Sequence, residues 1–125
     1  MGTITHMEIN DLFAVNVARC AHWHPQGLEE WSALEWAGAM TGEAGEAANA
    51  AKKLKRLDTS IPSINEGDRH YADHFSASTA VAKEVADTII YGLLLMARVG
   101  VTDPESVIRE VFNKKSEEYG FTERV

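Results

Sequence analysis

The stretch TGEAGEAANAAKK, residues 41–53, combines strong helix formers with two glycines and two like charges. Alanine, lysine and glutamate favour helix, whereas Gly42 and Gly45 each cost about 1 kcal/mol relative to alanine inside a helix. Glu43 and Glu46 are three residues apart, so a helix places both carboxylates on one face, where they repel each other. The small residues around them leave room for a neighbouring helix or a ligand. We therefore expect a long helix that presents two carboxylates to a partner.

A second acidic pair occurs in KEVADTIIYG, residues 83–92. Glu84 and Asp87 are again three apart and share one helix face. If the two helices pack antiparallel, both pairs form a cluster of four carboxylates, and such oxygen ligands suit Mg²⁺ or Mn²⁺. Acidic pairs are also common on solvated faces. The second pair, however, borders an apolar segment, where unpaired charges are costly unless they bind something.

The rest of the chain predicts an all-α fold, a four-helix bundle formed by one domain over residues 1–125. Apolar residues at helical spacing predict the first helix from Ile9 to about Cys20. Residues 58–75 are polar and contain proline and glycine, which indicates a loop. Residues 1–7 are a possible leader, with Met7 as an alternative start. Ser32 with Glu35, and Thr102 with Glu105 around Pro104, have the pattern of capping boxes. We expect a second helix after Ser32 to about Leu57, a third from about Ser78 to Arg98, and a fourth over residues 106–120.

Composition narrows the classes of partner. The 125 residues carry a net charge of −7, which argues against nucleic acid or an anionic membrane surface as a partner. A polyanionic substrate would therefore need local cations, most simply a metal. The single cysteine, Cys20, excludes a disulfide framework within the chain and fits the reducing cytoplasm. The longest apolar run, residues 88–100, is shorter than the roughly 18 residues of a membrane span.

The two acidic segments resemble a known family. GEAGEAANAAKKLKR (residues 42–56) followed by EVADTIIYGLLL (residues 84–95) is similar to the MazG-type all-α nucleoside triphosphate pyrophosphohydrolases, whose signature is E-x-x-E on one helix and E-x-x-D on the next. The resemblance covers about residues 9–120, and the compact MazG-like proteins of phages and bacteria are the most similar subgroup. The distance from Glu46 to Glu84 is longer than in many members, which indicates an enlarged loop.

The resemblance implies an activity and a ligand set. Glu43, Glu46, Glu84 and Asp87 would hold magnesium, and water would attack the α-phosphorus of a nucleoside triphosphate to give a monophosphate and pyrophosphate. Metal ions would offset the phosphate charge and lower the pKa of a bound water. A carboxylate of the first pair, Glu46 ahead of Glu43, would accept the proton. The base, the sugar and the number of metal ions stay open.

Residues outside the acidic pairs are candidates for substrate binding. The family places basic residues and an asparagine near the end of the fourth helix, and here the corresponding segment offers Arg109, Asn113, Lys114 and Tyr119. Lys53 would neutralise phosphate, and Trp23 in HWHP would stack on the base, with His22 or His24 making a polar contact. The structural alternatives are a solvated helix end, where lysine complements the helix dipole, an exposed lysine, and simple packing of the tryptophan.

The predicted third helix is apolar on most faces from Thr88 to Ala97, more than one small core can bury. We expect a homodimer or homotetramer to cover this surface, unless the first helix and the 58–75 loop do so. The alternative function is a non-catalytic helical interaction module with a solvated acidic face. A di-iron bundle needs Glu-x-x-His motifs, which the sequence lacks. His70, Asp73 and His74 have zinc-like spacing but fall in a polar loop without a further ligand, so we expect solvent exposure.

Overall fold

The computed structural model describes residues 6–58 and 73–125. Over these residues the chain contains four α-helices, one short 3₁₀ helix and no strand. The all-α prediction is thus confirmed for the described part of the chain. The helices are α1 (Ile9–Cys20), α2 (Ala33–Asp58), α3 (His74–Arg98) and α4 (Pro104–Tyr119), and the 3₁₀ helix is η1 (Gly27–Glu30).

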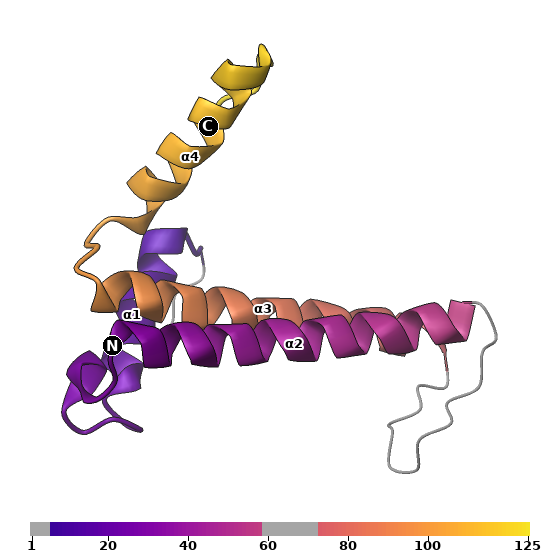
Figure 1. Cartoon of the computed structure of the whole chain (residues 1–125), viewed down its shortest axis with the longest axis horizontal. Coiled ribbons are helices and arrows are strands. Elements are labelled where there is room, and N and C mark those ends of the chain that lie inside the picture. Colours follow the sequence, from indigo (N-terminus) through magenta and orange to yellow (C-terminus); the bar gives the residue numbers. More distant parts are fainter. Residues whose placement is uncertain (1–5, 59–72) are drawn as a thin grey trace.

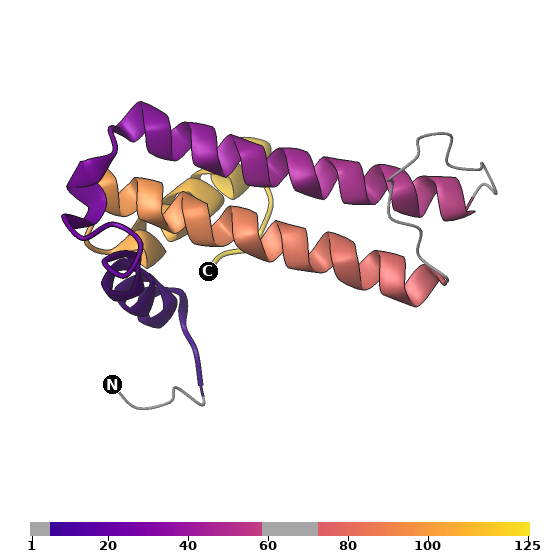
Figure 2. The same cartoon turned by 90° about the horizontal axis from the view of Figure 1, so that it is seen from below.

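The central unit is a hairpin of α2 and α3. The two long helices run antiparallel side by side over most of their lengths, as both views show (Figure 1, Figure 2). Helix α1 packs against α3 near the end of the hairpin at which α2 begins, and η1 closes that end. This arrangement brings the middle of α2 opposite the middle of α3, where the two acidic pairs lie.

The core lies at the closed end of the hairpin. Trp36 is 1% exposed, and its indole nitrogen donates a hydrogen bond to the Leu28 carbonyl at 2.9 Å. Buried Cys20 from α1 and Leu94 from α3 complete this cluster, and Trp31 packs against it. Trp31 and Trp36 therefore both pack in this core, and the indole hydrogen bond gives the buried Trp36 N–H a partner.

Local sequence signals set most helix ends. The Ser32/Glu35 capping box is present, with the Glu35 backbone N–H donating to Ser32 Oγ and the Ser32 N–H donating to Glu35 Oε1. Helix α3 begins at His74 rather than near Ser78, because Asp73 accepts a hydrogen bond from the Ser76 N–H at 2.7 Å. The predicted 58–75 loop is therefore shorter at both ends. Its residues 59–72, which include His70, lie outside the described residues.

The predicted Thr102/Glu105 capping box is wrong. The N-cap of α4 is Asp103, whose side chain accepts from the Ser106 N–H. The Glu105 carboxylate instead accepts from the Asn10 backbone N–H at 3.0 Å, a contact between α1 and α4. A long-range hydrogen bond has replaced the local one that the sequence pattern suggested.

Helix α4 stands apart from the hairpin. It packs on α1 and then projects away from α2 and α3 (Figure 1). Its apolar side chains are largely exposed, including Val111 at 63% and Phe112 at 45%. A mainly apolar groove of about 560 Å³ lies where α2, α3 and the start of α4 meet, lined by Met40, Ile89, Leu93, Met96 and Ile108 among others. Within one chain, neither α1 nor α4 covers this surface.

Candidate metal and nucleotide site

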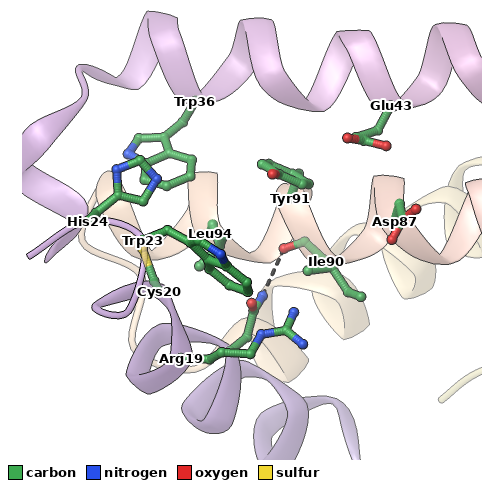
Figure 3. A pocket seen from close by; sticks show the side chains of 11 residues that line it. Arg19, Cys20, Trp23, His24, Trp36, Glu43, Asp87, Ile90, Tyr91 and Leu94 are labelled. Atoms are coloured by element: carbon green, nitrogen blue, oxygen red, sulfur yellow. Dashed lines mark hydrogen bonds between the residues drawn. The ribbon is translucent and has the colours of Figure 1, made fainter.

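The acidic pairs of α2 and α3 face each other across the hairpin. Glu43, Glu84 and Asp87 each offer a carboxylate oxygen within 4.8 Å of the other two. Figure 3 shows Glu43 descending from α2 toward α3, opposite Asp87. The spacing of three residues within each pair and the antiparallel packing of the helices together produce this meeting point. Three of the four carboxylates predicted as metal ligands thus lie within reach of one cation.

Glu46 lies at the edge of this acidic cluster. It is exposed, one helical turn beyond Glu43, and close enough to Glu43 and Glu84 to affect the pKa of each. It is not among the three carboxylates that share the 4.8 Å separation. Glu46 therefore lies beside the position that the other three carboxylates surround rather than among them.

The cluster is electrostatically unfavourable without a cation. Desolvation raises the pKa of Glu43, and the neighbouring carboxylates of Glu46, Asp87 and Glu84 raise it further. The pKa of Glu84 is raised by desolvation and then by the contact with Glu46 and the charge of Asp87. Glu84 Oε2 is also buried and has no hydrogen-bond partner among the described residues. A buried, unpaired carboxylate oxygen is a costly arrangement that a bound cation would relieve.

A pocket opens directly beside the acidic cluster. It has a volume of about 330 Å³ and lies between α1, α2 and α3. Glu43 and Asp87 form one end of it, and Trp36 and Tyr91 form part of its wall (Figure 3). Flat aromatic walls next to a carboxylate cluster suit a ligand that has an aromatic ring at one end and phosphates at the other.

Helix α1 lines the pocket with residues that the sequence reasoning did not select. Asn16 is 4% exposed, and its side-chain nitrogen donates to the Ile90 carbonyl at 2.8 Å. Arg19 and Cys20 follow on the same face, and burial and the charge of Glu30 raise the pKa of the Cys20 thiol. The overlooked signal was a polar residue, Asn16, within the apolar stripe of an amphipathic helix.

The predicted base-stacking residue Trp23 also lines the pocket. Its ring is 66% exposed, and the Arg19 guanidinium lies over it at 5.2 Å. His24 lines the pocket too, with Nδ1 hydrogen-bonded to Glu30 Oε2 at 2.9 Å, whereas His22 is exposed. Tyr91, one turn after Asp87, is a further wall residue that the sequence reasoning passed over as part of an apolar run.

The other predicted substrate-binding residues lie away from this pocket in the single chain. Lys53 is two turns beyond Glu46 on α2, about 10 Å further along the helix axis. Arg109 lines a separate pocket beside α1, and Asn113 exchanges two hydrogen bonds with the Val125 backbone. Lys114 is exposed, and the Tyr119 ring stacks on Phe121. A role for the α4 residues at the acidic cluster therefore requires a second chain.

The predicted exposure of the histidine-rich segment agrees with the described residues. His74 Nε2 lies 3.3 Å from an Asp58 carboxylate oxygen with both side chains exposed, and Asp73 acts as the N-cap of α3. No helix in the described ranges, 6–58 and 73–125, has the length and apolar character to cross a membrane. No protein-family model matches this chain, and no curated protein and no solved structure is significantly similar to it.

Proposed function

We propose that this chain is a magnesium-dependent nucleoside triphosphate pyrophosphohydrolase of the MazG-like, all-α type, which cleaves the triphosphate to a monophosphate and pyrophosphate. The observation that carries the proposal is the meeting of Glu43, Glu84 and Asp87 within 4.8 Å at the end of an aromatic pocket. The resemblance of residues 42–56 and 84–95 to that family supports it from the sequence.

The donor set fits a hard divalent cation. All three ligand atoms are carboxylate oxygens, the type that Mg²⁺ and Mn²⁺ prefer. Glu84 Oε2 has no hydrogen-bond partner among the described residues, and the pKa values of Glu43 and Glu84 are raised. Both observations favour a site that a bound cation would stabilise. Mg²⁺ bound there would screen the charge of the phosphates and act as a Lewis acid on the phosphoryl oxygens. The exposed face of the cluster leaves room for phosphate oxygens to complete the coordination.

Residues of the chain bind the substrate and transfer the proton in this proposal. The aromatic walls of the pocket bind the base and thereby hold the α-phosphate near the carboxylates. Binding of the base thus orients the phosphorus for attack by water. Glu46, exposed at the edge of the cluster, accepts the proton of the attacking water, and Glu43 is the second candidate for this role. The attack breaks the bond between the α-phosphorus and the bridging oxygen, and pyrophosphate leaves.

The cations of α4 enter this proposal through a second copy. In one chain the net charge is −7, and Arg109 and Lys114 lie away from the acidic cluster. The exposed apolar side chains of α4 and the groove beside α3 need covering, and a symmetric homodimer, or two paired homodimers, covers both. In such an assembly Arg109, Asn113, Lys114 or Tyr119 of one chain complements the phosphates bound by another.

A non-catalytic interaction module is the competing function. The specific observation in its favour is the exposed apolar surface of α4 and α3, including Ile89 at 54% and Phe112 at 45%. It differs in one measurable respect, since it needs no cation at the acidic cluster. A titration of Mg²⁺ into the metal-free chain and into Glu84→Gln separates the two functions, because only the enzyme proposal requires binding that the substitution weakens.

The activity itself is tested by incubating the purified chain with Mg²⁺ and the standard nucleoside triphosphates. The proposal expects equal amounts of monophosphate and pyrophosphate, with none formed when EDTA removes the metal. The Glu84→Gln variant should lose most of this activity, whereas Glu118→Gln on the exposed surface of α4 should keep it.

A further inference from the structure

Residues 121–125 fold back along α4, and we call this segment the strap. Helix α4 ends at Tyr119, and Gly120 has a φ of 71°, a left-handed conformation that lets the chain reverse direction. The Phe121 N–H then donates to the Ser116 carbonyl at 2.8 Å, and the Phe121 ring stacks on Tyr119. The mark C in Figure 1 accordingly lies beside the middle of α4 rather than beyond its end.

Asn113 holds the far end of the strap. Its Nδ2 donates a hydrogen bond to the Val125 carbonyl at 3.0 Å, and its Oδ1 accepts one from the Val125 N–H at 2.9 Å. The reciprocal pair fixes the orientation of the amide, because a backbone N–H only donates and a carbonyl only accepts. Both ends of the Asn113 amide are therefore engaged with the backbone of one strap residue.

Val125 also lies near Arg109. The two residues line a pocket of about 400 Å³ between α1 and α4. Arg109 and Asn113 are four residues apart and so share a face of α4. The strap therefore lies on the face of α4 that carries two of the residues to which the proposed function gives a role in phosphate binding.

A phosphate oxygen and the strap compete for the same group on Asn113. Nδ2 is the one atom of the amide that can donate to a phosphate oxygen, and it already donates to the Val125 carbonyl. Both hydrogen bonds between Asn113 and Val125 are exposed to solvent. Such bonds are weak enough in net terms for a charged ligand to replace them.

We propose that the strap is autoinhibitory: it competes with the substrate phosphates for the Arg109 and Asn113 face of α4 and must leave before this face binds them. The inference rests on the proposed function in assigning α4 to phosphate binding. It adds a closed state to that function. The closed state lowers the apparent affinity for phosphate in proportion to the fraction of chains in which the strap is open.

Two substitutions at Val125 test the strap without changing α4 or the acidic cluster. Val125→Pro removes the backbone N–H that donates to Asn113 Oδ1. Val125→Ala keeps this N–H and is the matched control, because the Val125 side chain is 63% exposed and contributes little packing.

The probe is inorganic pyrophosphate with Mg²⁺, which supplies the phosphates without a base. In titration calorimetry Val125→Pro should bind it about threefold or more tightly than wild type, and Val125→Ala should bind it as wild type does. Equal affinities of Val125→Pro and wild type, or weaker binding by Val125→Pro, would overturn the proposal.

Release of the strap is observed directly by ¹⁵N relaxation of the wild-type chain. The heteronuclear NOE of the Val125 amide should fall when Mg²⁺ and pyrophosphate saturate the chain, whereas that of Glu117 in the last turn of α4 should stay constant. A strap that only stabilises the end of α4 would stay in place. An unchanged NOE at Val125 in the saturated chain would therefore refute the competition.

These measurements and the hydrolysis assay separate the strap from the proposed function. Tighter pyrophosphate binding by Val125→Pro without cleavage of any standard triphosphate would contradict the enzyme and leave the strap intact. Cleavage to monophosphate and pyrophosphate with equal pyrophosphate affinities would contradict the strap and leave the enzyme intact. Absence of pyrophosphate binding in both chains would overturn the strap, because the face that it covers then binds no phosphate.

Discussion

Glu84 is the carboxylate whose charge the fold accommodates least well. One of its oxygens is buried and has no hydrogen-bond partner in the part of the chain that the structure describes, and desolvation and the carboxylates nearby raise its pKa. A raised pKa means that the folded chain holds this proton more tightly than the unfolded chain. The stabilising contribution of protonated Glu84 is therefore present in acid, below the ordinary value of 4.5, and is lost as the pH rises through the raised pKa.

Glu84→Gln should accordingly stabilise the metal-free chain at pH 7 and change its stability little at pH 4. The amide is neutral and nearly the same shape, so it removes the repulsion that appears on ionisation. Thermal unfolding in EDTA at the two pH values measures the effect, with Glu118→Gln as the exposed control. An equal melting temperature for Glu84→Gln and wild type at pH 7 would show that the cluster is not repulsive.

Glu46→Gln should lose about 10²–10⁴-fold in kcat and keep its fold, since a general base contributes a factor of this size. The side chain is exposed, and helix propensity differs little between glutamine and glutamate. Because the substitution also removes one charge from the acidic cluster, the melting temperature in EDTA should be no lower than that of wild type. Steady-state assays of pyrophosphate release check the prediction. If Glu46→Gln is fully active, Glu46 is not the proton acceptor.

The sequence predicted the acidic residues well and the pocket around them poorly. Helical periodicity places Glu84 and Asp87 on one face of α3 and Glu43 on α2, and the antiparallel packing of the two helices was the further assumption that brought them together. Asn16 and Tyr91 join the site because α1 crosses α3 at a particular point, and no local pattern encodes that crossing. A polar residue on an apolar stripe was the one available signal.

The junction between α1 and α4 depends on Asn10. The Asn10 backbone N–H donates a hydrogen bond to the Glu105 carboxylate, and the Asn10 side-chain nitrogen donates one to Asp103 Oδ1. The Asn10 side-chain oxygen accepts a hydrogen bond from the Glu105 backbone N–H in the first turn of α4. Asn10→Ala removes the two hydrogen bonds of the Asn10 side chain and leaves the Glu105 backbone N–H without its acceptor. We expect a loss of about 1–2 kcal/mol in the free energy of unfolding.

Chemical denaturation measures this loss, and hydrogen exchange should show faster opening at the start of α4. Asn49→Ala is the control, because Asn49 is exposed on α2 and alanine is the better helix former. That control should be neutral or slightly stabilising. An Asn10→Ala variant as stable as wild type would mean that apolar contacts alone hold α4 to α1.

The same junction explains why one capping prediction succeeded and another failed. Ser32 and Glu35 have no competing partners, so the local capping box forms as the pattern indicates. Near Pro104, Asp103 competes with Thr102 for the N-cap position and accepts the hydrogen bond from the Ser106 N–H. The Glu105 carboxylate accepts a hydrogen bond from the Asn10 backbone N–H instead of completing the capping box. Short-range patterns predict a helix start only where no distant residue offers a better hydrogen bond.

The exposed apolar surface of the chain predicts self-association. A chain of 13.8 kDa carries an apolar groove between α2 and α3 and an α4 whose aromatic and aliphatic side chains are open to solvent. Light scattering at micromolar concentration should give twice or four times the chain mass. A mass of one chain with full activity would refute both the shared surface and a shared site.

Phe112→Glu should shift this association toward the single chain by placing a charge in the apolar face of α4. Leu34→Glu is the matched control, since Leu34 is 81% exposed at the start of α2 and does not line the apolar groove. The control should keep the wild-type mass. The sequence indicated that the apolar face of α3 needs covering, but the direction of α4 depends on the junction with α1 and was not predictable.

We propose that the acidic cluster serves metal-dependent cleavage between the α- and β-phosphates, and ³¹P NMR of the reaction identifies the bond that breaks. With Mg²⁺ and each standard nucleoside triphosphate in turn, wild type should form pyrophosphate and monophosphate in equal amounts from at least one of them, and Glu84→Gln should form little of either. The claim would be contradicted by release of orthophosphate and a diphosphate, by no metal-dependent cleavage of any standard triphosphate, or by undiminished cleavage in Glu84→Gln.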